Sequence, residues 1–157
     1  MKVYDCFTFF NELDLLEIRL QELYDTVDYF IIAESNMSHS GKTKDHILSD
    51  NWERFKPYAE KIRRVQVDDS IEDQRLQFPN QESDAWVREK FQRHALSRGL
   101  HDLSPEDLVV MSDLDEVPRA EMIEMTAQLD GLYDKMFNDN ADLKEQVRQF
   151  NQITRDA

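Results

Sequence analysis

Short apolar runs alternate with amphipathic stretches along this chain. Four of the runs have the length and composition of β-strands, and they lie at residues 2–10, 28–34, 64–67 and 108–112. The second run is almost entirely apolar, which is typical of a parallel strand buried on both faces. Because a helical or polar connection follows each run, the pattern predicts an α/β fold with a mainly parallel sheet and flanking helices.

Helices are predicted between these strands. One follows Asn11, which can cap a helix together with the acid at position 14, and it carries leucines at positions 13, 16, 20 and 23 on one face. A second covers residues 84–98 and ends at Gly99. The connections 35–48 and 68–81 are polar, and we expect both to be long loops.

The last part of the sequence is predicted to be helical. A helix should begin after Pro118 and end at Gly131, and residues 132–157 should form a helical tail. The tail has an apolar stripe made of Leu143, Val147 and Phe150. We expect this stripe to cover apolar surface within the chain or across a homodimer. The predicted organisation is therefore a domain of residues 1–131 followed by the tail.

Composition narrows the class of protein. The chain has 157 residues, is 40% hydrophobic and has only three glycines, which favours one globular domain. No apolar run approaches the roughly 20 residues of a membrane span, and the charged start does not resemble a signal peptide. A single cysteine, Cys6, cannot form an internal disulfide. These features favour a reducing, cytoplasmic setting.

The net charge excludes further partners. The chain has 33 acidic and 19 basic residues, a formal net charge of −14. Affinity for DNA or RNA depends on Lys and Arg that neutralise phosphates, so nucleic acid is not an expected partner. The same argument applies to anionic membrane surfaces. A phosphate ligand bound by the more acidic second part would need a metal cation as an intermediary.

The strongest chemical feature is the sequence Ser-Asp-Leu-Asp-Glu-Val-Pro at residues 112–118. In extended chain, residues two apart point the same way, so Asp113 and Asp115 should face one side and Leu114 the core. Two carboxylates at the carboxyl end of a parallel strand, beside the crevice of the sheet, favour Mg²⁺ or Mn²⁺. The sequence therefore predicts a metal site that can hold a diphosphate.

Two other motifs compete for this chemistry. The stretch around Asp113 also resembles the first motif of haloacid-dehalogenase phosphatases, but the lysine and the later acidic pair of that family have no counterparts in the helical sequence that follows. Residues 40–43, Ser-Gly-Lys-Thr, resemble the end of a phosphate-binding loop. That motif needs a glycine at the position of Asn36, and no strong helix pattern follows. Both readings remain distant alternatives.

Five blocks together resemble glycosyltransferase family 17. They are DCFTFFNELDLLEIRL at 5–20, VDYFIIAES at 27–35, SGK at 40–42, WVREKFQR at 86–93 and SDLDEVP at 112–118. The blocks occur in the order found in the family, over residues 2 to about 130. The resemblance implies a GT-A fold, a UDP-sugar donor and a divalent metal, Mn²⁺ or Mg²⁺. With the alternation of strands and helices, it also implies that the first and fourth strands are adjacent.

The resemblance also implies which residues form the site. Asp113 and Asp115 would bind the metal. Glu34 would accept hydrogen bonds from a ribose or base, and Arg88 and Gln92, four apart on one helix, would reach the same ligand. The full set implied for the donor comprises Phe10, Asn11, Glu12, Glu34, Ser35, Lys42, Arg88, Gln92 and Arg93.

Several of these residues have a structural alternative that the sequence leaves open. Lys42 is either a phosphate ligand or a solvated loop charge. Trp86 is either part of the core or a surface on which a base stacks. Arg93 is either a ligand of the donor or the surface partner of Glu89, four residues before it.

The expected function is transfer of a sugar, N-acetylglucosamine, from a UDP donor to a glycan acceptor. The alternative is a non-catalytic domain that binds a nucleotide sugar or another protein. Residues 132–157 contain none of the family blocks, and the sequence indicates no catalytic base. The chain therefore resembles the donor-binding half of such an enzyme, and we expect it to bind donor but to transfer sugar poorly.

Overall fold

The structure is a computed structural model that describes residues 1–139, and the side chains of residues 1–132. The stripe of Leu143, Val147 and Phe150, and the homodimer expected through it, lie outside the described residues. In chain order the elements are β1 (Val3–Phe9), α1 (Leu13–Leu23), β2 (Tyr29–Ser35), α2 (Ile47–Asp50), α3 (Trp52–Phe55), the 3₁₀ helix η1 (Lys56–Lys61), β3 (Ile62–Val67), α4 (Ile71–Gln77), α5 (Asp84–Ala95), the 3₁₀ helix η2 (Leu96–Gly99), β4 (Leu108–Met111) and α6 (Ala120–Asp139).

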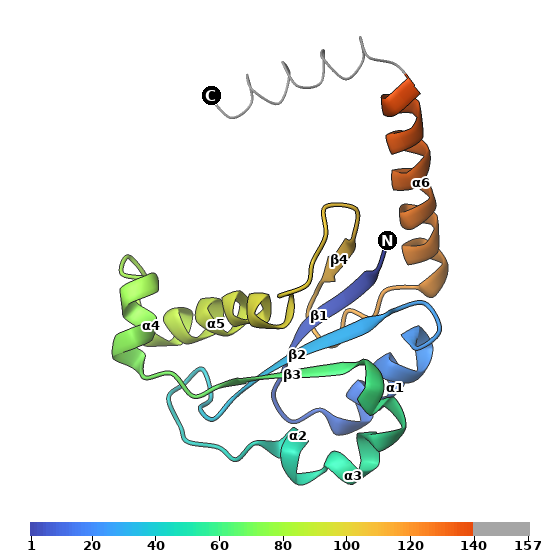
Figure 1. Cartoon of the computed structure of the whole chain (residues 1–157). Coiled ribbons are helices and arrows are strands. Elements are labelled where there is room, and N and C mark those ends of the chain that lie inside the picture. The colour runs from blue at the N-terminus through green and yellow to red at the C-terminus, as the bar shows by residue number, and fades with distance from the viewer. Residues whose placement is uncertain (140–157) are drawn as a thin grey trace. The chain divides into compact units, whose positions relative to one another are not determined.

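The described residues form a sheet of four parallel strands in the order β3-β2-β1-β4 (Figure 1). Each strand lies close to its predicted position, and β1 pairs with β4 from Val3 opposite Leu108 to Cys6 opposite Met111. The predictions of a mainly parallel α/β sheet and of adjacent first and fourth strands are confirmed. β3 begins at Ile62 rather than at residue 64, because Ile62 already pairs with Phe30 of β2.

Helices pack on both faces of the sheet (Figure 1). Side chains alternate between the faces along each strand. On one face, α5 and η2 close a core made of Tyr4, Cys6, Ile31, Ala33, Val65, Val67, Phe91, Ala95 and Leu96. On the other face, α1 lies against β1, where Arg19 contacts Asp5 and the ring of Phe7. Burial raises the pKa of the Cys6 thiol to about 12, so Cys6 is an inert core residue.

Gly99 is required by the close approach of η2 to the sheet. A Cβ atom at this position would lie 2.4 Å from Cγ2 of Ile31, a distance that only a shift of the strand or helix could relieve. The sequence placed a helix end here, and the structure agrees: α5 ends at Ala95 and the chain continues as η2 up to Gly99. The glycine therefore serves packing at the end of the helix.

The polar stretch 68–81 contains a helix, α4, so the prediction of one long loop is wrong. Ser70 caps this helix, and its hydroxyl accepts a hydrogen bond from the backbone N–H of Asp73 at 3.2 Å. The buried side chain of α4 is polar, Gln74, whose amide donates to the carbonyl of Asp69 at 2.8 Å. A helix without an apolar stripe has no hydrophobic period, and this is why the sequence pattern missed it.

Two helix ends also differ from their predictions. The cap position of α1 is occupied by Glu12, not Asn11, and no side chain caps the helix. The Glu12 carboxylate turns back and accepts hydrogen bonds from the backbone N–H groups of Phe10 and Asn11. α6 continues through Gly131 to Asp139 rather than ending at the glycine.

The chain separates into two compact units, one of residues 1–119 and one that begins at Ala120. The sheet and the cavity described below belong entirely to the first unit. The described part of the second unit is α6, whose exposed apolar side chains are Met122, Met125, Leu129 and Leu132. Among the described helices, none combines enough length with enough apolar sequence to cross a bilayer.

Candidate functional site

A cavity of about 730 Å³ opens at the carboxyl edge of the sheet. It lies where β1, β2 and the segment after β4 meet. From β1 the chain adds β2 and β3 on one side, and it later adds β4 on the other side of β1. Such a reversal of strand order leaves a crevice at the carboxyl ends, the usual ligand position in open parallel sheets. The cavity is lined by Thr8, Phe9, Phe10, Glu12, Leu15, Ser35, Met37, Ser38, His39, Ser40, Lys44, Glu89, Gln92, Arg93, Asp113, Leu114 and Asp115.

Residues 112–116, called here the Asp-x-Asp turn, follow β4 directly. The backbone N–H of Glu116 donates to the carbonyl of Asp113 at 3.0 Å, and the Glu116 carboxylate accepts from the N–H of Asp113 at 3.2 Å. Leu114 is buried, and both Asp113 and Asp115 line the cavity. Both carboxylates therefore face the cavity, and Leu114 is buried, because residues 113–116 form a turn and not because extended chain continues past β4.

Asp113 is paired with Arg93 of α5. The Arg93 Nη2 atom donates to Asp113 Oδ1 at 2.7 Å, and the same nitrogen lies 3.6 Å from the carboxylate of Glu89. The surface pair of Glu89 and Arg93 is thus present, but the contact with Asp113 is shorter. Arg93 and Glu89 both line the cavity, which places one cation and two anions at its α5 side.

The two carboxylates of the Asp-x-Asp turn suit a metal that is shared with a ligand. In the part of the chain that the structure describes, no three His, Cys, Asp or Glu residues are placed to hold an ion together. Mg²⁺ and similar hard cations are often bound by one or two carboxylates, with substrate phosphates and water completing the shell. Asp113 and Asp115 fit that mode, whereas a closed protein cage is not formed.

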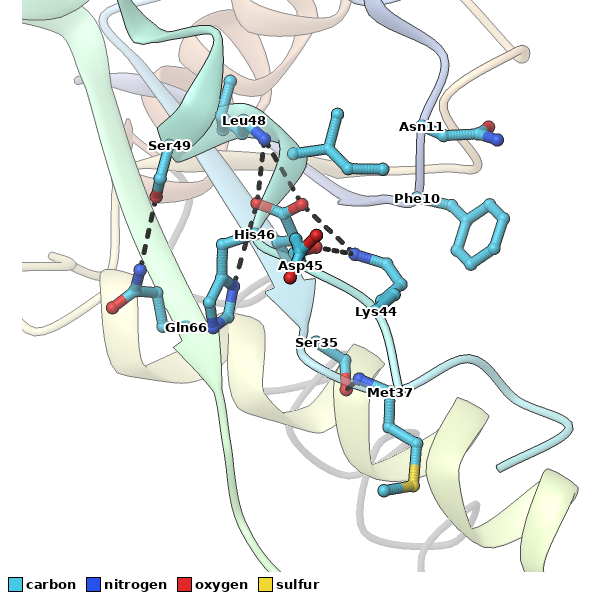
Figure 2. Close-up of polar contacts among 12 residues, drawn as sticks. Phe10, Asn11, Ser35, Met37, Lys44, Asp45, His46, Leu48, Ser49 and Gln66 are labelled. Carbon is cyan, nitrogen blue, oxygen red and sulfur yellow. Dashed lines mark hydrogen bonds and ion pairs between the residues drawn. The ribbon is translucent and has the colours of Figure 1, made fainter. Parts of the chain in front are cut away.

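Glu34, at the end of β2, is the centre of a polar cluster beside the cavity (Figure 2). Its carboxylate accepts hydrogen bonds from Lys44 Nζ at 3.2 Å and from the backbone N–H of Leu48 at 3.3 Å to each oxygen. His46 Nδ1 lies 4.0 Å from the same carboxylate. The side chain is buried and does not line the cavity. Glu34 therefore anchors the loop that follows β2.

The lysine at the cavity is Lys44 rather than Lys42. Lys42 is exposed and does not line the cavity, which agrees with a solvated loop charge. Lys44 is held between the carboxylate of Glu34 and the carbonyl of Asp45, and its ammonium lies 5.5 Å from the centre of the Phe10 ring. Figure 2 shows the Lys44 ammonium directed toward Asp45 and the carboxylate beside it. Nothing in the spacing of the sequence distinguishes the two lysines.

Arg88 and Gln92, four residues apart on α5, both contact His39. Arg88 Nη1 donates to the carbonyl of His39 at 3.1 Å, and Gln92 Oε1 lies 3.2 Å from His39 Nε2. The Arg88 guanidinium also covers Gly41, whose φ of +88° favours glycine. Gln92 lines the cavity but its amide also donates to Ala33, so both side chains brace the loop that carries His39.

The other predicted donor residues divide into two groups. Phe10, Glu12 and Ser35 line the cavity, and Ser35 also accepts a hydrogen bond from the N–H of Met37 at 3.1 Å (Figure 2). Asn11 is exposed and outside the lining. Trp86 is 51% exposed and also lies outside it, so the interpretation of Trp86 as a core residue is wrong.

Comparison with known proteins agrees with this picture. The sequence model of glycosyltransferase family 17 matches residues 1–151, which is further than the motifs extend. The β-1,4-mannosyl-glycoprotein 4-β-N-acetylglucosaminyltransferases of Homo sapiens and Rattus norvegicus are each 27% identical over 130 residues, and that of Mus musculus is 26% identical.

The alignments cover 77% of this chain but only 22% of each relative, so the chain spans about a fifth of their length. No solved structure matches the chain significantly. The family match covers nearly all of the sequence and includes every segment that lines the cavity. The chain belongs to glycosyltransferase family 17.

Proposed function

We propose that this chain binds the nucleotide-sugar donor of a metal-dependent glycosyltransferase with a GT-A fold. The donor is a UDP-sugar, with N-acetylglucosamine as the transferred sugar, and the acceptor is a glycan. Family membership supports sugar transfer, and the names of the relatives support the choice of sugar. The observation that carries the proposal is the pair Asp113 and Asp115 in the lining of a cavity at the carboxyl edge of a parallel sheet.

The size and composition of the cavity suit this ligand. Small-molecule sites commonly enclose about 300–1,000 Å³, and the cavity falls within this range. Arg93 and Lys44 supply positive charge on two sides of an otherwise acidic site. The half-exposed ring of Phe10, directly after β1, offers an apolar surface to a base or sugar.

Each of these residues has a defined part in donor binding. Asp113 and Asp115 would hold Mn²⁺ or Mg²⁺. When bound, the ion supplies Lewis-acid neutralisation of the charge on the leaving diphosphate. Arg93 would bind the same diphosphate after the metal ion replaces it as the partner of Asp113. Gln92 and Arg88 keep the loop of His39 in place above the donor.

A second candidate function is donor binding without transfer. It is favoured by the site itself, because the roles given above to the cavity residues concern the donor and its metal alone. Transfer requires an acceptor hydroxyl held in line with the anomeric carbon, and such positioning can supply about 7–11 kcal/mol of the barrier. Binding and transfer therefore have to be measured separately.

Calorimetry tests the donor site. Wild-type protein is titrated with UDP-N-acetylglucosamine in the presence of Mn²⁺, of Mg²⁺ and of a chelator, and we expect binding only with a metal. Asp113→Ala and Asp115→Ala should each abolish this binding without loss of the fold. Asp14→Ala is a matched control, because it removes an exposed carboxylate of α1 that is paired with Arg54 away from the cavity. Unchanged donor affinity in both site variants would contradict the metal role.

A transfer assay separates the two candidate functions. Radiolabelled UDP-N-acetylglucosamine is incubated with Mn²⁺ and mannose-containing glycans. Label that accumulates in the glycan over many turnovers supports an enzyme. Metal-dependent donor binding without labelled glycan supports the binding domain.

A further inference from the structure

Arg19 is a fully buried cation that no predicted role explains. It lies on α1 with none of its surface exposed, and the Cζ atom of its guanidinium lies 4.4 Å from the centre of the Phe7 ring. Nε and Nη2 donate to the two carboxylate oxygens of Asp5 at 2.9 and 2.7 Å. The remaining donors point away from Asp5, toward the segment that follows β4.

That segment is the Asp-x-Asp turn. Arg19 Nη2 donates to the hydroxyl of Ser112 at 2.7 Å. Nη1 has two N–H groups and lies within hydrogen-bond distance of three backbone carbonyls, those of Asp113 at 2.7 Å, Leu114 at 3.2 Å and Glu116 at 3.4 Å, so one N–H is shared. One side chain therefore joins β1, α1 and the turn that carries the two carboxylates of the cavity.

Stability alone does not account for this arrangement. Burial raises the pKa of Asp5, and the hydrogen bonds and charge of Arg19 oppose that rise. A buried ion pair costs desolvation energy that its attraction often fails to exceed, and apolar residues of the same volume are commonly as stable. What an apolar pair cannot provide is a set of donors to the turn. What Arg19 adds to the ion pair is a set of hydrogen bonds that hold the backbone of residues 112–116 in place.

The bonds also explain how the turn faces the cavity. Because three carbonyls converge on one guanidinium, the backbone of the turn has a fixed orientation, and Leu114 is buried beneath it. The side chains of Asp113 and Asp115 are left on the cavity side. Lysine could keep the pair with Asp5, but its single ammonium has only three donors and lacks the planar fork.

We propose that Arg19, held by Asp5, is a positioning residue that fixes the Asp-x-Asp turn so that both carboxylates can bind one cation. This role rests on the proposed function for its ligand, but the order of the turn can be measured without any ligand. Second-layer partners of metal ligands commonly change metal affinity by about 10- to 100-fold when they are replaced.

Two variants test the proposal. Arg19→Met combined with Asp5→Leu removes both charges and keeps most of the buried volume, and Arg19→Lys keeps the charge. The first readout is hydrogen exchange of the amides in residues 112–116 without ligand. The second is the affinity for UDP in the presence of Mn²⁺. We expect faster exchange in this segment and an affinity about 10- to 100-fold weaker in both variants.

The matched control is Arg63→Met combined with Asp102→Leu. Arg63 also forms a bidentate ion pair with Asp102 and donates a hydrogen bond to the carbonyl of Gly99. It lies on β3 and does not line the cavity. We expect the control to change stability while exchange in residues 112–116 and the affinity stay as in the wild type. If the double Arg19 variant does not fold, Arg19→Lys decides.

The outcomes separate the two proposals. Wild-type exchange in residues 112–116 and wild-type affinity in a folded Arg19 variant would overturn the positioning role. If wild-type protein binds no UDP with Mn²⁺, the donor site is refuted, and exchange alone decides whether Arg19 orders the turn. Equal effects in the Arg63 control would show general loosening and would also overturn the role.

Discussion

Asp113 stands between two positive partners, Arg93 in the structure and a metal ion in the proposed complex. The contact with Arg93 is 2.7 Å long, and both side chains are about half exposed. Exposed ion pairs contribute only about 0–1 kcal/mol, so the pair is weak enough to be exchanged for a divalent cation. In the proposed complex the released guanidinium would stay in the cavity, where it can contact the diphosphate.

This exchange gives a prediction for Arg93→Ala. Mn²⁺ alone should bind slightly more tightly, by up to about fivefold, because the ion no longer displaces a partner of Asp113. UDP-sugar affinity in the presence of Mn²⁺ should fall, because the diphosphate loses a cationic ligand. Mn²⁺ binding followed by electron paramagnetic resonance and UDP-sugar calorimetry measure the two effects. Arg98→Ala removes a similar pair, with Asp69, and should change neither. Weaker binding of Mn²⁺ alone would contradict the exchange.

Two glycines in helical segments play opposite roles. Gly99 of η2 lies against Ile31, and an added Cβ would approach it to 2.4 Å, whereas a Cβ at Gly131 of α6 would meet no atom within 4 Å. Sequence patterns assigned both glycines to helix ends. The packing of each element shows that only Gly99 is needed, and that Gly131 simply interrupts an otherwise favourable helical sequence.

The corresponding alanine variants should therefore change stability in opposite directions. Gly99→Ala should lower the free energy of unfolding by about 1–3 kcal/mol through overpacking. Gly131→Ala should stabilise α6 by about 0.5–1 kcal/mol, because alanine loses less backbone entropy in a helix. Urea unfolding followed by circular dichroism measures both. A neutral Gly99→Ala variant would show that η2 moves freely away from β2.

At the scale of the whole sheet unit, Asp102 joins the chain start to the far edge strand. It accepts hydrogen bonds from Arg63 of β3 at 2.6 and 2.9 Å, from the hydroxyl of Tyr4 at 3.2 Å and from Lys2 at 3.4 Å. The hydrogen bonds from Arg63 hold the pKa of Asp102 well below its usual range, and the nearby charge acts in the same direction. Asp102 therefore stays ionised in the folded protein at pH values where it is protonated in the unfolded chain.

The sign of the resulting pH dependence follows from linkage. A depressed pKa in the folded state contributes stability above the unfolded value, about 3.9, and this contribution is lost as the pH falls further. Asp102→Asn should remove this contribution. The free energy of unfolding of the variant should therefore fall less than that of the wild type between about pH 5 and pH 2, the range over which a carboxylate with a depressed pKa loses its contribution. Urea unfolding at a series of pH values measures the difference. Parallel pH profiles would contradict the role of Asp102.

Local sequence alone determined most of the fold. The apolar runs located the four strands, because the side chains that a strand buries against the helices are mostly apolar. The inner strand β2 is buried along almost its whole length, whereas the edge strand β3 alternates buried valines with exposed polar residues. The placement of Asp113 and Asp115 directly after the fourth run located the cavity, because the carboxyl ends of parallel strands meet at one edge of the sheet. Helix α4 was not predicted, because its buried residue is the polar Gln74 and the segment therefore shows no apolar periodicity.

Tertiary contacts decided which polar side chains reach the cavity. Lys42 and Lys44 are equivalent in the sequence, and only the bonds of Lys44 to Glu34 and Asp45 place it at the cavity. Arg19 is buried on the same side of α1 as Leu16, Leu20 and Leu23, but the spacing of the leucines predicted neither its burial nor its partners. They lie 14 residues away at Asp5 and more than 90 residues away in the Asp-x-Asp turn. A periodic pattern reports which face of an element is buried, and contacts over such distances arise only when the sheet brings its strands together.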